Sequence, residues 1–98
     1  MAEPTPDPRT VYRSQPGVGW VMTDQGIRWV DARGGGGQWP YPQAAAWALV
    51  VSGRGFGAIV PLLAAVMAAD EAAAAEALGA WLEDWLAAGL LAAEGGGG

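Results

Sequence analysis

One stretch, GQWPYPQAAAWAL at residues 37–49, passes from an aromatic segment with prolines into a run rich in alanine. Alanine has the highest helix propensity and Pro42 suits a first helical position, so the second half predicts a helix from Gln43 to Val51. Gln38 to Tyr41 predict a short strand. Because Pro40 has no backbone N–H to donate to a ladder, we expect that strand to lie at the edge of a sheet.

Two further strands are predicted before this edge strand. Val18 to Thr23 and Ile27 to Ala32 are rich in β-branched and aromatic residues. A turn at Gly26 separates them, and the four glycines 34–37 form the loop of the second hairpin. The pattern predicts a three-stranded antiparallel meander. Because glycines specify register weakly, it does not settle the register in which the last strand pairs.

Two helices are predicted after the Ser52-Gly53 break. The first begins near Phe56 and contains Pro61, which removes a hydrogen bond and should bend the axis. The second begins at Asp70, a residue suited to capping, and ends near Gly89. Its apolar positions follow helical spacing and comprise Leu78, Trp81, Leu82, Trp85 and Leu86.

This order of elements predicts an α+β fold, with a three-stranded antiparallel meander followed by three helices in a winged-helix-like arrangement. We expect one domain over residues 10–92. Residues 1–9 are acidic and rich in proline, which predicts a disordered N-terminal segment. Residues 93–98 are predicted to be a flexible tail rich in glycine.

The composition argues against an enzyme. The chain contains no cysteine and no histidine, so it lacks the commonest general base and the commonest metal ligands. Ser14 and Ser52 are its only serines, and neither has a histidine to activate it. We therefore expect no catalytic residue, no metal and no cofactor. The absence of cysteine also fits a cytoplasmic protein.

The charge argues against nucleic acid and membrane partners. The net charge is −5, all five basic residues are arginines, and none lies beyond Arg54. Binding a polyanion needs a basic stripe, which the C-terminal half lacks. The longest apolar run, residues 56–69, contains Pro61 and is shorter than the roughly 20 residues that span a bilayer.

Six tryptophans in 98 residues are the most unusual feature of the composition. Trp47 is expected in the core. Trp39 lies on the edge strand beside a proline, so it either lines a recognition groove or packs in the core. Trp81 and Trp85 form a core stripe, or one of them lies in a cleft beside the edge strand. Adjacent Glu83 and Asp84 point about 100° apart on a helix and indicate a solvated face.

Residues 17–91 resemble the PqqD-like family, the small RiPP recognition elements that bind leader peptides of ribosomally made, modified peptides. The resemblance lies in the meander with its aromatic edge (GWVMTDQGIRWVDARGGGGQWPYPQAAAWALVVSG), in GFGAIVPLLAAV, and in the closing AEALGAWLEDWLAAGLL. The length and hairpin spacing look most like the standalone leader-binding proteins of lasso-peptide clusters. Pro40, Pro42 and Pro61 depart from the family pattern.

The resemblance implies a function as well as a fold. A leader peptide would add as an antiparallel strand to the edge strand, with side chains entering a groove beside the last helix. Carried over by position, the peptide-binding residues would be Gln38, Trp39, Tyr41, Leu78, Trp81, Leu82 and Trp85. The protein would be an adaptor that holds the precursor for a partner protease or modifying enzyme.

Two alternatives remain open from the residues. A winged-helix nucleic-acid-binding protein would have the same elements, but it needs basic residues on a recognition helix, and the last two helices contain none. A general protein-interaction subunit would use the same groove for a partner's strand. Because both this subunit and a leader-binding protein act by strand addition, the sequence does not separate them.

Overall fold

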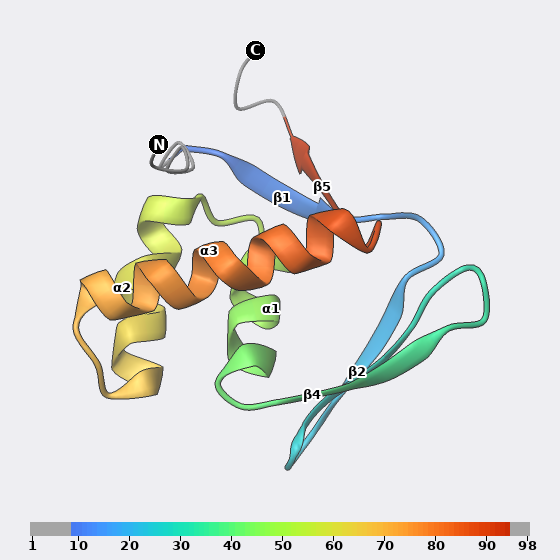
Figure 1. Ribbon diagram of the computed structural model, residues 1–98, viewed down its shortest axis with the longest axis horizontal. Helices are drawn as coiled ribbons and strands as arrows, with labels where there is room; N and C mark the ends of the chain where they lie inside the picture. Colours follow the sequence, from blue (N-terminus) through green and yellow to red (C-terminus); the bar gives the residue numbers. More distant parts are fainter. Residues whose placement is uncertain (1–8, 95–98) are drawn as a thin grey trace.

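The computed structural model describes residues 9–94 of the chain. The predicted N-terminal segment up to residue 8 and the glycines 95–98 of the predicted tail lie outside this range. The elements lie in the order shown in Figure 1: β1 (Val11–Ser14), β2 (Gly19–Thr23), β3 (Gly26–Val30), β4 (Gly36–Pro40), α1 (Gln43–Val51), α2 (Phe56–Met67), α3 (Glu71–Ala87) and β5 (Leu91–Glu94). The predicted α+β fold, strands followed by three helices, is confirmed.

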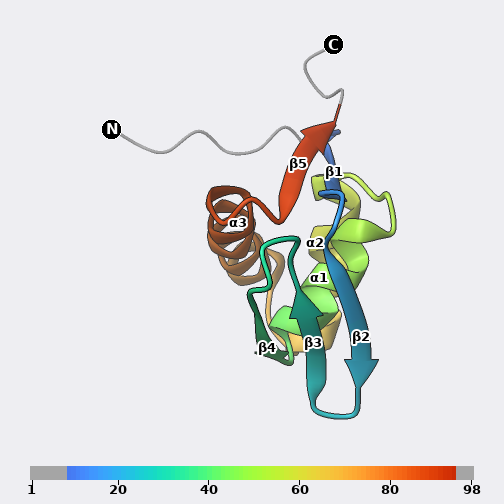
Figure 2. The ribbon, with the colours of Figure 1, turned by 90° about the vertical axis from the view of Figure 1, so that its right-hand side faces the viewer.

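The predicted meander is the sheet β2-β3-β4, with β3 in the middle (Figure 2). Trp29 of β3 is in register with Trp20 on β2 and with Gly37 on β4. The strand β3 ends before the predicted Ala32 because Asp31 turns the chain. The Asp31 carboxylate Oδ1 accepts the N–H groups of Arg33 and Gly35 at 2.9 and 2.8 Å.

The strand β4 begins inside the glycine run that was predicted to be a loop. Gly36 fits there because it has no side chain. A Cβ at that position would lie 2.5 Å from the carbonyl oxygen of Trp29 on β3. The close approach of the two backbones therefore specifies glycine, and it supplies the register that the sequence left open.

The three helices follow the sequence pattern closely. The helix α1 has the predicted bounds, and α2 continues through Pro61. Asp70 caps α3, since its carboxylate accepts the N–H of Ala73 at 2.8 Å. Gly89 ends α3 with φ +76°, and Leu90 folds back to donate its N–H to the carbonyl oxygen of Trp85 at 2.9 Å.

A second sheet of two strands was not predicted. The strands β1 and β5 pair antiparallel, from Val11 opposite Glu94 to Ser14 opposite Leu91 (Figure 1). This ribbon contains Ala93 and Glu94, which the sequence assigned to the tail. It turns Tyr12 into the core, where that residue is buried. The pairing joins segments about 80 residues apart, which no local pattern reveals.

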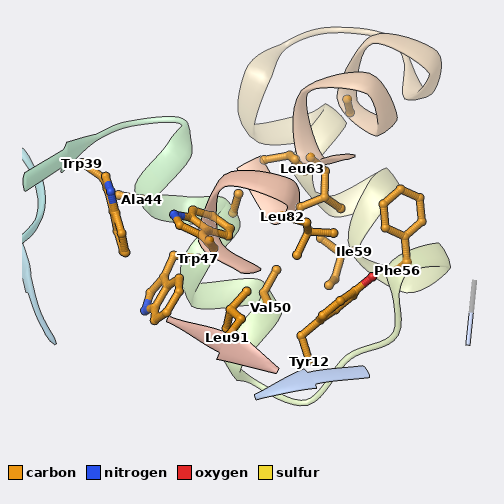
Figure 3. Packing of buried hydrophobic residues seen from close by; sticks show 14 of the residues in the cluster. Tyr12, Trp39, Ala44, Trp47, Val50, Phe56, Ile59, Leu63, Leu82 and Leu91 are labelled. Atoms are coloured by element: carbon orange, nitrogen blue, oxygen red, sulfur yellow. The ribbon is translucent and has the colours of Figure 1, made fainter. Parts of the chain in front are cut away.

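The core lies between the helices and the inner faces of both sheets (Figure 3). Its large and fully buried side chains come from α1, α2, α3, β3 and β5: Trp47, Val50, Ile59, Leu63, Leu78, Leu82, Trp85, Ile27 and Leu91. Within residues 9–94, no single helix is long and apolar enough to span a membrane, although α2 and α3, bent by 109° at their junction, reach that length and composition together.

Candidate functional site

Five of the six tryptophans form one connected cluster at the end of β4. Trp39 stacks on Trp29 with ring centroids 5.2 Å apart, and it also packs on Trp47 at 4.8 Å and on Trp85 at 5.3 Å. Trp20 reaches the cluster through an edge-on contact with Trp47 at 5.6 Å. The cluster therefore joins all three strands of the meander to α1 and α3.

Of the two alternatives left open for Trp39, a groove residue or a core residue, the structure shows packing in the core. Its side chain is only 9% exposed, and Figure 3 shows it among the buried residues beside Ala44. The proline beside it indicated an edge correctly. However, the inner face of an edge strand is still covered by the layer beneath it, here α1 and α3, so an edge position does not imply an exposed side chain.

The α3 residues predicted to bind peptide are mostly core residues. Leu78, Leu82 and Trp85 are 0%, 2% and 2% exposed, so they support the cluster and do not line an open groove. Trp81 is half-buried and packs against the rim of the core. Their assignment to peptide binding stays a prediction, and among them Trp81 has the most accessible side chain.

Gln38 and Tyr41 are exposed, but neither side chain points toward α3. Gln38 is in register with Arg28 and lies with it on the outer face of the sheet. Tyr41 donates its hydroxyl to the carbonyl oxygen of Thr23 at 3.2 Å, at the far end of the β2-β3 hairpin. Among the seven predicted residues, the structure brings only Trp39 and Trp85 into ring contact.

The backbone of β4, by contrast, has a free edge. The N–H of Asp31 donates to the carbonyl oxygen of Gly35 at 2.9 Å, so Gly35 faces β3. Residues of an antiparallel strand turn their backbone groups alternately toward and away from the partner strand. The backbone N–H and C=O groups of Gly37 and Trp39 therefore also point toward β3. Those of the other three residues of β4 point away from it.

These outward-facing residues are Gly36, Gln38 and Pro40, and within residues 9–94 no strand pairs with them. They offer three carbonyl oxygens but only two N–H groups, because proline has none. Figure 2 shows β4 on the α3 side of the sheet. A strand added here would lie beside β4, below the helix.

The other edge of the sheet, β2, has a different character. Trp20, Val21 and Met22 are three consecutive large apolar residues, 38%, 57% and 48% exposed. Val21 also borders an open hollow of about 680 Å³ on the outer face of the sheet. Val30, Gln38 and the exposed Arg28 line the same hollow, and Trp20 and Trp29 of the cluster also border it.

The core beside this edge contains no buried polar or charged residue among residues 9–94. No cluster of three metal-ligating side chains occurs within residues 9–94. The indole N–H groups of Trp47 and Trp85 have no hydrogen-bond acceptor among the described residues. The two rings instead meet edge to face at 5.1 Å, an arrangement in which a ring edge points at a π face.

Comparison with known proteins identifies the fold. No family model matches the chain, and no curated protein matches its sequence. Its structure, however, is similar to that of a lasso peptide synthetase B1 complexed with the leader peptide. The TM-score is 0.74 at 18% identity, and the match covers 83% of this chain and 96% of the other. The two proteins share an α+β fold built on a meander and three helices.

The sequence predicted strand addition to this edge, but four of the side chains that it named for binding are buried. It left open which backbone groups of β4 face away from β3, because that depends on the register. Pro40 was the available signal, because proline in a strand belongs where no ladder bond is made.

Proposed function

We propose that this chain is a leader-peptide-binding adaptor, a RiPP recognition element without catalytic activity. It captures a precursor peptide by strand addition to β4 and presents it to a partner protease or modifying enzyme. The observation that carries the proposal is the similarity, at a TM-score of 0.74 and over 96% of that chain, to a protein solved with a leader peptide.

The free edge of β4 supports this proposal from the chain itself. Among residues 9–94, no strand pairs with the donors and acceptors of Gly36 and Gln38, and main-chain hydrogen bonds give such an edge affinity for an extended peptide. The tryptophan cluster fixes the inner face of β4 against α1 and α3. A fixed edge loses little conformational freedom when a strand binds, which favours affinity.

The charge supports a peptide over a nucleic acid. Within the described residues α3 contains Glu71, Glu76, Glu83 and Asp84 and no basic residue. The whole chain has a net charge of −5, which repels a polyanion. We therefore place winged-helix nucleic-acid binding second. The absence of cysteine and histidine supports a non-catalytic protein of the cytoplasm.

The test is a titration with a synthetic peptide that covers the leader half of the precursor encoded beside this gene, followed by amide NMR. We expect saturable binding, with shifts concentrated in β4 and in residues 75–86 of α3. Val21→Lys on β2 is the matched control, since it changes the other edge of the sheet and should bind the peptide like the wild type.

Absence of binding up to about 100 μM, an affinity of only about −5.5 kcal/mol, would overturn leader binding and favour a protein partner. A 20-base-pair DNA duplex is titrated in parallel. Saturable binding of the duplex without binding of the peptide would favour the nucleic-acid alternative.

A further inference from the structure

The hairpin turn before β4 limits how far an added strand can pair at one end of the β4 edge. The carboxylate of Asp31 accepts the N–H groups of Arg33 and Gly35, and the Asp31 carbonyl oxygen accepts the N–H of Gly34 at 3.3 Å. Gly34 has φ +86°, in the left-handed region, so the chain turns out of the strand direction here. An added strand finds no free donor before Gly36.

Pro40 limits the pairing of an added strand at the other end of the β4 edge. It faces away from β3, so the N–H that proline lacks would have pointed at an added strand. A peptide residue opposite Pro40 can donate its own N–H to the Pro40 carbonyl oxygen, but its carbonyl receives no donor in return. Beyond Pro40 the chain leaves the sheet, since Pro42 has the helical backbone angles φ −84° and ψ −5° and precedes α1.

The inner face of this segment provides two contact positions. Side chains directly opposite each other on antiparallel strands lie on the same face, so only peptide residues opposite Gly37 and Trp39 point inward. The indole ring of Trp29 lies directly against Gly37, since its Nε1 would be only 3.2 Å from a Cβ built there. Both inward positions therefore meet indole rings, one of Trp29 and one of Trp39.

We propose that β4 pairs with five residues of the peptide, antiparallel and in one register, over the window Gly36–Pro40. This inference rests on the proposed function and adds the length, register and side-chain pattern of the bound segment. The second and fourth peptide residues are apolar and face the indole rings, while the first, third and fifth face the outer side of the sheet.

The first experiment is amide hydrogen exchange on the wild-type chain with and without the leader peptide defined above. In the free protein the amide hydrogens of Gly36 and Gln38 should exchange quickly. In the complex the exchange rate of both should fall roughly tenfold or more. Gly37 and Trp39 should be protected in both states. Two outcomes would overturn the inference while the peptide still binds and the proposed function stands. One is new protection of the Trp20 amide on β2, and the other is the absence of new protection at the amides of Gly36 and Gln38.

Pro40→Ala tests the stop at the end of the window and has a readout without peptide. The amide that this substitution creates at position 40 should exchange fast in the free protein, because it faces away from β3. With peptide it should become protected, and the peptide should bind about two- to tenfold tighter through the added hydrogen bond. Protection of the new amide in the free protein would show that this position faces β3 and would overturn the inference.

Gln38→Pro and Gln38→Ala separate the backbone from the side chain at the centre of the window. Gln38→Pro removes an outward N–H and should weaken peptide binding by roughly tenfold. Gln38→Ala keeps that N–H and should therefore weaken peptide binding less than Gln38→Pro does. Equal effects of the two variants contradict the window. If the wild-type chain does not bind the leader peptide at all, the proposed function and this inference are both overturned.

Discussion

Two tryptophans on the two edge strands of one sheet pack on the same residue of α1, yet their surroundings differ. Trp39 on β4 contacts three rings and is 9% exposed. Trp20 on β2 has one ring contact among the described residues, with Trp47, and is 38% exposed. The more exposed aromatic residue thus lies on the edge that we do not assign to peptide binding.

Under the proposed function, an edge suited to strand addition is defined by its backbone and by what holds that backbone in place. The strand β4 presents few apolar side chains, but the tryptophan cluster anchors it to two helices. The strand β2 exposes three consecutive apolar side chains, and only one of its residues, Trp20, packs in the tryptophan cluster. Strand addition uses main-chain bonds, so a fixed backbone matters more than an exposed ring.

The largest expected effect separates these two tryptophans. Trp39→Ala should lower the free energy of unfolding by about 3–5 kcal/mol, because it leaves a cavity between three rings. Trp20→Ala, the matched control, should lower it by about 1–2 kcal/mol, since the side chain is partly in water already. Urea unfolding followed by far-UV circular dichroism measures both. Equal losses would show that β2 is anchored as firmly as β4.

A smaller effect compares the backbone contacts on the two sides of β3. Gly26 has φ +144°, and a Cβ there would lie 2.0 Å from the carbonyl oxygen of Trp39. Gly26→Ala should therefore destabilise the fold by about 2–4 kcal/mol. Gly19→Ala is the control on β2, where a Cβ would meet Val30 at an ordinary 3.6 Å. A stable Gly26→Ala variant with an unchanged melting temperature would contradict the tight junction between β3 and β4.

The smallest effect appears only at high pH and lies in the β1-β5 ribbon, away from both edges. Burial raises the pKa of Tyr12 above its ordinary value of 10.0, because the core disfavours the phenolate. The contribution of Tyr12 to stability is therefore fully present below the unfolded pKa near 10 and is lost as pH rises through the raised folded value.

The variant Tyr12→Phe should show a weaker loss of stability than the wild type between about pH 9 and 11, measured by urea unfolding at each pH. An identical alkaline loss in Tyr12→Phe would mean that another group causes it.

Much of the fold could be predicted because its signals are local. Helix propensity and capping act within a few residues, so the bounds of α1, the cap at Asp70 and the turn at Gly89 follow from neighbouring residues. The meander is also local, since its strands are consecutive and short turns connect them. For the same reason, Pro40 correctly indicated that β4 lies at an edge of the sheet.

The sequence alone therefore predicts the three strands of the meander, the three helices and which strand lies at an edge. Only the tertiary structure decides that Trp39 and Leu82 are buried, that β1 pairs with β5, and that Pro40 turns its missing donor outward. Burial depends on which elements cover a face, and pairing of distant segments depends on the packed core. The direction of Pro40 depends on register, where a shift of one residue reverses every backbone group and side chain.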